Sequence, residues 1–205
     1  MYRRSVVLPL TATSLFACSK TQTSRAHAYV TIPTSGKASQ LLAAVHAQTR
    51  HQVVYDSGYT HLDYPNGDVA SDKGACSDVL IRAYRTLYID LQKLVHEHME
   101  AHFDLYPKTW GLKAPDPSID HRHVPNLMVL FSRFAKVLSL SHDPETYQPG
   151  DILASHPIGP HIALVSDQKP KGLNRLLVIE NIGGGVQKND HLLSYPIIGH
   201  YRYAL

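Results

Sequence analysis

Cysteine is nearly absent from this chain, and this scarcity limits the disulfides and thiol sites that the chain can form. The 205 residues include 2 cysteines, Cys18 and Cys76. Residues 1–28 read as an export leader, so their removal leaves Cys76 alone and excludes an internal disulfide. Cys76 follows a tight turn and begins an amphipathic helix, where backbone N–H groups and the helix dipole favour a thiolate. We therefore take a cysteine-dependent hydrolase as the first hypothesis.

The chain also lacks long apolar runs and a strong excess of charge of one sign. With 43% hydrophobic and 18% charged residues, it suits one compact domain and excludes a disordered chain. Apart from the short leader, no run approaches the length needed to span a bilayer. Residues 1–28 hold four basic side chains and no acidic one, so removing them changes the formal net charge from +3 to −1. A near-neutral domain offers no electrostatic footprint for nucleic acid.

The leader has two alternative cleavage sites. Arg3 and Arg4 form a basic start, and residues 6–17 are short and mostly apolar. The sequence Leu-Phe-Ala-Cys ending at Cys18 resembles a lipobox, whereas Ala-His-Ala ending at Ala28 resembles an ordinary signal cleavage site. Both predict an exported protein of the periplasm or cell envelope, and the first makes it a lipoprotein whose membrane contact is a lipid anchor at Cys18. The alternative interpretation is an interior hydrophobic strand or helix.

Hydrophobic periodicity predicts an α+β fold, with helices first and an antiparallel sheet afterwards. After a leader at 1–28 and a linker at 29–37, the domain occupies residues 38–205. Helical spacing is found over residues 38–48, from Cys76 onward, over 91–103 and over 125–138. Short apolar runs typical of strands follow at residues 150–154, 161–165, 176–179 and 197–203.

A nucleophilic Cys76 needs a base from another part of the chain. The chain has 14 histidines, so their number decides nothing, but His161 opens an apolar strand directly after Gly-Pro. A third group should orient the imidazole, and Glu180 and Asn181 end the next predicted strand. These two side chains point to opposite faces of a regular strand, so only one can serve, unless the following glycine run forms a bulge.

Three other features allow a functional or a structural interpretation. Asp78, two residues into the helix, satisfies the dipole at the helix N-terminus. Arg122 could bind a carboxylate-bearing substrate, or it could form a salt bridge inside its own loop. His98 and His102 have the i, i+4 spacing of a metal pair, but they do not fit a zincin motif. A solvated helix edge explains them better, and we expect no metal.

Taken together, these motifs resemble the DUF1287 family of bacterial envelope proteins, within the NlpC/P60 papain-like superfamily. The resemblance covers residues 40–205. The matching stretches are residues 64–69, 74–85, 89–97, 119–122, 124–127, 160–167, 181–183 and 199–203. It implies a papain-like core in which N-terminal helices pack on a small antiparallel sheet.

The resemblance also implies a function, namely cleavage of an amide or peptide bond in peptidoglycan peptides. Cys76 would be the nucleophile and His161 the base, with no cofactor, and Tyr64 would shape the substrate cleft. From the residues themselves, we add Asp78 and Arg122 as further candidates for substrate binding. Family members commonly have a histidine immediately before the Asn-Ile-Gly motif, where this chain has Glu180. Two alternatives therefore stay open, an inactive peptidoglycan-binding or scaffold protein and a cysteine-dependent acyltransferase.

Overall fold

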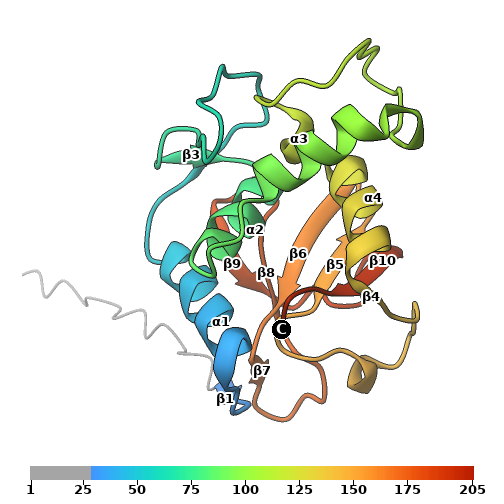
Figure 1. Ribbon diagram of the computed structural model, residues 1–205. Helices are drawn as coiled ribbons and strands as arrows, with labels where there is room; N and C mark the ends of the chain where they lie inside the picture. The colour runs from blue at the N-terminus through green and yellow to red at the C-terminus, as the bar shows by residue number, and fades with distance from the viewer. Residues whose placement is uncertain (1–28) are drawn as a thin grey trace, which may run out of the picture.

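Helices cover one face of a six-stranded sheet in the computed structural model, which describes residues 29–205 (Figure 1). The predicted leader, with Cys18 and both cleavage sites, lies outside the described residues. The helices are α1 (Gly36–Gln48), α2 (Cys76–Arg85), α3 (Leu91–Ala101) and α4 (Val124–Phe134), with short 3-10 turns at Phe103–Leu105, Asp120–Arg122 and Pro144–Thr146. The mixed helix-and-sheet class predicted from the sequence is confirmed.

The main sheet has the strand order β4-β10-β5-β6-β8-β9, and every neighbouring pair in it is antiparallel. Two further two-stranded sheets join β1 to β7 and β2 to β3. The strands are β1 (Tyr29–Thr31), β2 (Val54–Tyr55), β3 (Lys73–Gly74), β4 (Lys136–Val137), β5 (Ile152–Ser155), β6 (His161–Val165), β7 (Gln168–Pro170), β8 (Val178–Asn181), β9 (Val186–Asn189) and β10 (Ile197–Arg202).

Strand β6 lies inside this sheet and is buried along its whole length. Ile162 and Leu164 belong to the large core between sheet and helices, whereas Ala163 and Val165 belong to a smaller apolar cluster. Successive side chains of a strand point to opposite faces, so both faces of β6 are covered. This explains why its sequence is a continuous apolar run that begins with His161.

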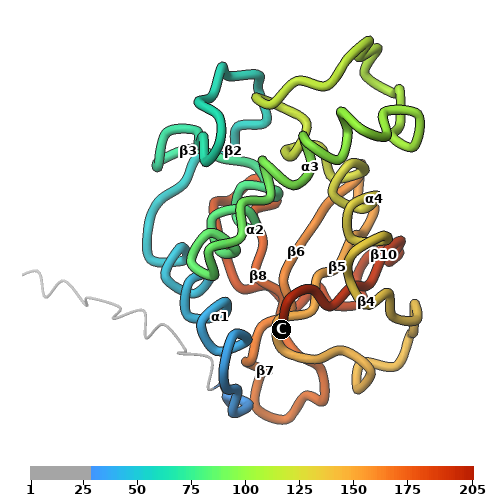
Figure 2. The backbone as a smooth tube through the Cα atoms, in the orientation of Figure 1, coloured from blue at the N-terminus to red at the C-terminus, as the bar shows by residue number. Residues whose placement is uncertain are grey.

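Helix α2 packs on the main sheet and places Cys76, its first residue, beside that sheet. It packs against β6 and β8, and α1 packs beside it (Figure 2). Most of its residues are buried, including Val79, Leu80, Ala83 and Tyr84. Burial on this scale leaves the helix little freedom to shift, so the position of Cys76 relative to β6 is set by core packing.

Two segments differ from the sequence-based expectation. Residues 29–37 were expected to be a linker, but β1 pairs with β7 in the register Tyr29↔Pro170. The helix expected over residues 125–138 ends at Phe134, because Lys136 and Val137 pair with β10. In both cases a strand partner distant in sequence determines the local conformation.

Asp151 connects the start of β5 to β10. Its carboxylate accepts hydrogen bonds from His200 Nε2 at 2.9 Å and from Arg202 Nε at 2.7 Å. Asp151 is 0% exposed. Burial acts to raise the pKa of this carboxyl, but the bonds from His200 and Arg202 outweigh burial and hold the pKa below its ordinary value. The ionised carboxylate thus fixes the two strands on the β4 side of β6.

Replacing Asp151 with Asn should therefore destabilise the fold. The change removes the charge that pairs with Arg202 of β10, whose side chain is 23% exposed, and losing a hydrogen bond to a charged group costs about 1.5–3 kcal/mol. Urea unfolding of Asp151→Asn measures the loss. The exposed Asp104→Asn is the matched control and should unfold like the unmodified protein. Equal unfolding midpoints for all three proteins would contradict this role of Asp151.

Candidate active site

The turn that leads into α2 is held from several sides. Gly74 has φ +155°, which favours glycine, and a Cβ there would lie 3.1 Å from Asp78 Cβ. The Gly74 carbonyl accepts a hydrogen bond from Asn181 Nδ2 at 2.9 Å. Asp78 Oδ2 accepts one from the Ala75 backbone N–H at 2.6 Å. These contacts fix Cys76 as the first residue of the helix.

Asp78 and Arg122 form a buried ion pair behind this turn. Arg122 Nη2 lies 2.9 Å from Asp78 Oδ2, and the two side chains are 2% and 4% exposed. The guanidinium also donates to the carbonyls of Gly58 at 2.7 Å and Asp56 at 2.8 Å. Arg122 forms an internal salt bridge, but with Asp78 of α2 and not within its own loop as expected. Arg122 and Asp78 are committed to each other and to the backbone, which leaves neither free for the predicted contact with a substrate.

Cys76, His161 and Glu180 come together where α2 meets the sheet. His161 Nε2 donates a hydrogen bond to Glu180 Oε2 at 2.7 Å. Cys76 lies close enough to His161 to act on the pKa of its imidazole. Because Nε2 binds Glu180, Nδ1 is the ring nitrogen that remains available to another partner. All three residues are buried, with exposed fractions of 5%, 5% and 2% respectively.

The pKa of the His161 imidazole is strongly shifted in this cluster. Burial acts to lower the pKa of His161, but hydrogen bonds and charge interactions with Cys76 and Glu180 outweigh burial and raise the pKa to about 9. The pKa of Glu180 is shifted downward. Burial acts to raise this pKa, but the hydrogen bonds from His161, Asn189 and His191 outweigh burial and hold it below the ordinary value. At neutral pH the site therefore holds an imidazolium against a carboxylate.

The structure separates the two candidates for the third position. Glu180 contacts His161, whereas Asn181 faces the other way and binds the Gly74 carbonyl. This is the opposite-face geometry expected of neighbouring residues in a strand. Asn181 Oδ1 also accepts the Gly183 backbone N–H at 3.2 Å. Glu180 thus orients the imidazole, and Asn181 ties strand β8 to the turn before Cys76.

A groove of about 600 Å³ opens beside His161. Its lining residues are mostly apolar or aromatic, and none carries a Lys, Arg, Asp or Glu side chain: Tyr55, Pro157, Ile158, Gly159, Pro160, His161, Ile182, Gly183 and Tyr195. Tyr55 interacts with Cys76 as well as lining the groove. Burial, with the charges of Cys76 and Asp78 adding to it and Arg122 opposing it, raises the pKa of Tyr55.

Tyr55 and Tyr195 are tyrosines of this groove, and Tyr64 is not. The Tyr64 hydroxyl donates to Glu97 on α3 at 3.4 Å, and its ring packs edge-on against His96 at 5.1 Å between centroids. Tyr64 does not line the groove. Sequence analysis missed Tyr55, whose only local signal was the short β-branched and aromatic run at residues 52–55.

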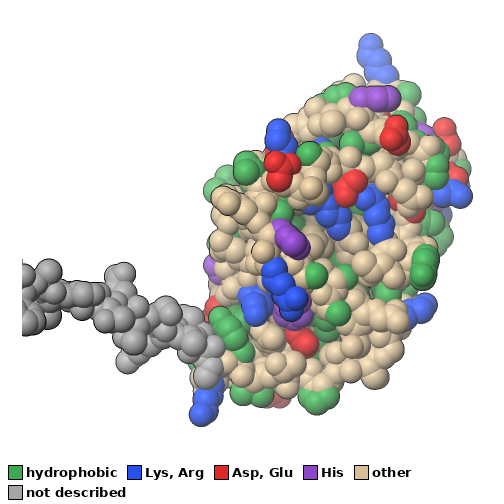
Figure 3. Space-filling model, turned by 90° about the vertical axis from the view of Figure 1, so that its left-hand side faces the viewer, with side chains coloured by type: hydrophobic (Ala, Val, Ile, Leu, Met, Phe, Trp, Pro, Cys, Tyr) green, Lys and Arg blue, Asp and Glu red, His purple; other side chains and the backbone are tan. Residues whose placement is uncertain are grey.

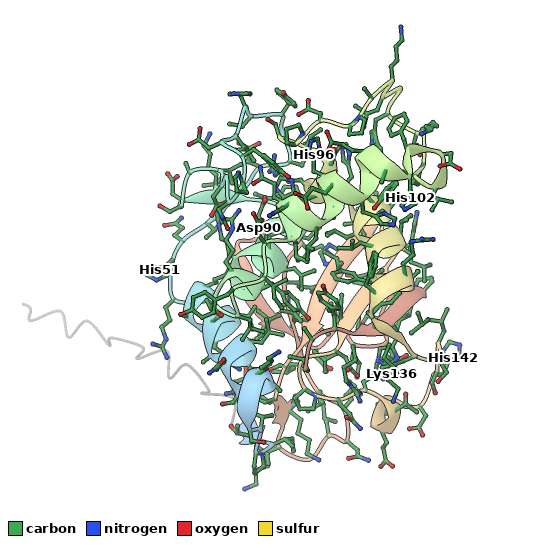
Figure 4. All side chains as sticks on the ribbon, in the orientation of Figure 1. His51, Asp90, His96, His102, Lys136 and His142 are labelled. Atoms are coloured by element: carbon green, nitrogen blue, oxygen red, sulfur yellow. The ribbon has the colours of Figure 1, made fainter. Side chains whose placement is uncertain are left out.

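The histidines of α3 have other partners. His98 Nδ1 bonds the Tyr106 hydroxyl at 2.7 Å, and the ring of His98 lies 4.7 Å from that of His102. His96 bonds Asp120 at 3.0 Å, and Figure 4 labels His96 on this helix and His102 directly after its end. In the part of the chain that the structure describes, no group of three or more His, Cys, Asp and Glu side chains is placed to hold a metal ion.

Charges of both signs are scattered over the face shown in Figure 3 and do not gather into a patch of one sign. Within residues 29–205, no helix combines the length and apolar character that crossing a bilayer requires.

The fold and the site define an α+β protein with a buried cysteine–histidine–glutamate cluster beside an open groove. The chain belongs to the DUF1287 family, described as "Domain of unknown function (DUF1287)", whose match covers residues 42–203. It is similar to "Uncharacterized protein YijF" of Escherichia coli (strain K12), with 49% identity over 151 residues, or 73% of each chain.

Among solved structures, the chain is similar to "Structure of NlpC1 from Trichomonas vaginalis", with 17% identity and a TM-score of 0.44. That match covers 84% of this chain, and this chain spans about half of that one, 46%.

The internal role of Arg122 predicts a loss of stability when the ion pair is broken. Arg122→Met leaves Asp78 buried without its partner, which should cost about 3–5 kcal/mol of unfolding free energy. Urea unfolding checks this, with the exposed Arg50→Met as the control. Unchanged stability together with weakened substrate binding would instead assign Arg122 to the substrate.

The raised pKa of His161 predicts a titration that NMR can measure. By NMR, His161 should lose its proton near pH 9, and Glu180→Gln should lower that midpoint because the stabilising carboxylate is gone. A folded pKa above the unfolded one stabilises the fold fully below pH 6.5, and this contribution is lost as pH rises to about 9. The unmodified protein should therefore lose more unfolding free energy over that interval than Glu180→Gln. An ordinary His161 titration near pH 6.5 would contradict the cluster.

Proposed function

We propose that this protein is an exported cysteine hydrolase of the cell envelope that cleaves an amide or peptide bond in peptidoglycan peptides. The buried cluster of Cys76, His161 and Glu180 at the N-terminus of α2 carries the proposal. The reaction type rests on that geometry. The substrate class rests on the sequence resemblance to NlpC/P60 proteins, as does the assignment of a papain-like core.

The cluster supports nucleophilic catalysis because each group has the partner its role requires. A protonated His161 beside the sulfur favours the thiolate, which is the nucleophilic form of cysteine. Glu180 holds the imidazole through Nε2, which leaves Nδ1 available to the sulfur. The first residue of a helix has a backbone N–H without a partner in the helix, and the Cys76 N–H can therefore stabilise an oxyanion.

In the proposed reaction, the Cys76 thiolate attacks the scissile carbonyl carbon and the carbonyl electron pair moves to oxygen. The tetrahedral oxyanion collapses, the C–N bond breaks, and His161 protonates the leaving amine. An acyl group then remains on the sulfur as a thioester. Glu180 stays ionised throughout, because its role is to hold the imidazolium in place.

Water completes the cycle. The neutral His161 takes a proton from a water molecule, whose oxygen attacks the thioester carbonyl. The C–S bond breaks, the carboxylic acid product leaves, and the thiolate–imidazolium pair forms again. Acyl transfer to an amine would follow the same path with the amine replacing water, and scaffold function would use the groove without this chemistry.

The groove supports a peptide substrate. It lies beside His161, and a volume of about 600 Å³ suits a ligand of a few residues. Tyr55 and Tyr195 offer flat apolar surfaces with a polar hydroxyl, which is typical of sites that bind partly polar ligands. The proposed substrate would place its scissile carbonyl at the Tyr55 end, where the sulfur lies.

Incubating the purified protein with muropeptides tests the proposal. We expect new amine termini, detected by mass spectrometry, that disappear in Cys76→Ala and in His161→Ala. Loss of a triad member removes most of the catalysis in enzymes of this kind, so the turnover number should fall by about 10³-fold or more.

The control is His142→Ala, an exposed histidine on the loop between β4 and β5 that Figure 4 labels. This variant should cleave at the unmodified rate. Product that persists in Cys76→Ala would exclude the cysteine mechanism, and muropeptide binding without turnover in all variants would favour the scaffold alternative. Product that requires an added amine would favour transfer.

A further inference from the structure

Both oxygens of the Glu180 carboxylate accept hydrogen bonds. Its Oε2 accepts from His161 Nε2 at 2.7 Å, while its Oε1 accepts from Asn189 Nδ2 at 3.0 Å and lies 2.7 Å from His191 Nδ1. Glu180 is 2% exposed. A carboxylate oriented by both oxygens cannot rotate without breaking these bonds. The direction of Oε2 toward the imidazole therefore depends on what Oε1 contacts.

His191 reaches this carboxylate from beyond the end of β9, which pairs with β8 in the register Glu180↔Gln187. Its side chain is 33% exposed, against 2% for Glu180. The ring packs edge-on against Tyr195 with 5.4 Å between centroids, and Tyr195 lines the groove. His191 thus connects the buried end of the cluster to the wall of the groove.

We propose that His191 is a positioning residue that fixes Glu180, and through it His161, in the orientation needed for attack by Cys76. The proposal rests on the proposed function for its catalytic meaning, but its structural content does not depend on the substrate. His191 does not touch the sulfur. It acts by donating Nδ1–H to Oε1, so that Oε2 remains directed at His161 Nε2.

The bond from His191 acts on the imidazole that takes part in the reaction and not on a group that binds the substrate. The positioning should therefore act mainly on the chemical step, on kcat, and only weakly on KM.

The test uses three variants of the full chain. His191→Ala removes the donor. His191→Asn keeps one, because the amide Nδ2 of asparagine stands close to where Nδ1 of histidine stands. His142→Ala is the matched control, since this exposed histidine lies on the loop between β4 and β5. The midpoint of the His161 titration is measured by NMR for each, together with kcat and KM on muropeptides.

We expect His191→Ala to lower the His161 midpoint by about one pH unit, a tenfold change in its protonation equilibrium. Its kcat should fall by a similar factor at nearly constant KM. His191→Asn should restore most of both, and His142→Ala should change neither. A His161 midpoint in His191→Ala that equals that of the unmodified protein, in a chain that is still folded, overturns the proposal.

The two readouts separate this proposal from the proposed function. If no variant, nor the unmodified protein, cleaves muropeptides, the hydrolase assignment fails, while a lowered midpoint in His191→Ala still supports the positioning role. If His191→Ala fails to fold, His191→Leu, which also lacks the donor, takes its place. A lowered His161 midpoint in folded His191→Leu supports the donor role, and the midpoint of the unmodified protein contradicts it.

Discussion

A buried positive charge on His161, held between Cys76 and Glu180, is the interaction on which the site depends. Burial alone would remove this proton, because a charged imidazole loses hydration in the interior. Interactions with Cys76 and with the Glu180 carboxylate reverse the outcome and raise the pKa of His161 to about 9. The same proton keeps Glu180 ionised and gives the sulfur a cationic neighbour. Without it, three buried polar groups would lack their compensating partners.

The fold provides this arrangement by joining two rigid elements. Helix α2 is packed into the main core, and β6 is buried between two strands of the sheet. Asn181, at the end of the neighbouring strand β8, binds the carbonyl of Gly74 in the turn before the helix and so ties the sheet to that turn. Arg122 completes the support by pairing with Asp78 behind the same turn. The cluster is thus positioned by backbone contacts as well as by its own hydrogen bonds.

Local sequence patterns were sufficient for the parts of this site that depend on short-range rules. A cysteine after a glycine turn and a histidine at the head of an apolar strand identified Cys76 and His161. The alternation of side chains along a strand showed that Glu180 and Asn181 point to opposite faces of the sheet. It does not show which of these faces meets the helix. That choice depends on the packing of β8 against α2, which lies beyond any local pattern.

The remaining site features depend on contacts between distant segments. Tyr55 lies in a two-residue strand whose position is set by parallel pairing with β3. His191 is one of 14 histidines, and only the return of the chain after β9 brings it to Glu180. Lys136 and Val137 were expected to lie at the end of a helix. They form strand β4 instead, because they pair with β10. Long-range pairing therefore decided what local propensity could not.

The reactivity of Cys76 toward iodoacetamide at pH 6 tests the central claim most directly. Mass spectrometry of the peptide that contains Cys76 gives the rate in the folded protein and in the same protein unfolded in urea. A sulfur paired with protonated His161 should be alkylated faster in the folded state, despite its burial, because a free thiol ionises only near pH 8.5. Slower alkylation in the folded protein, with a rate that rises only as free thiols ionise, would contradict the ion pair and the catalysis proposed from it.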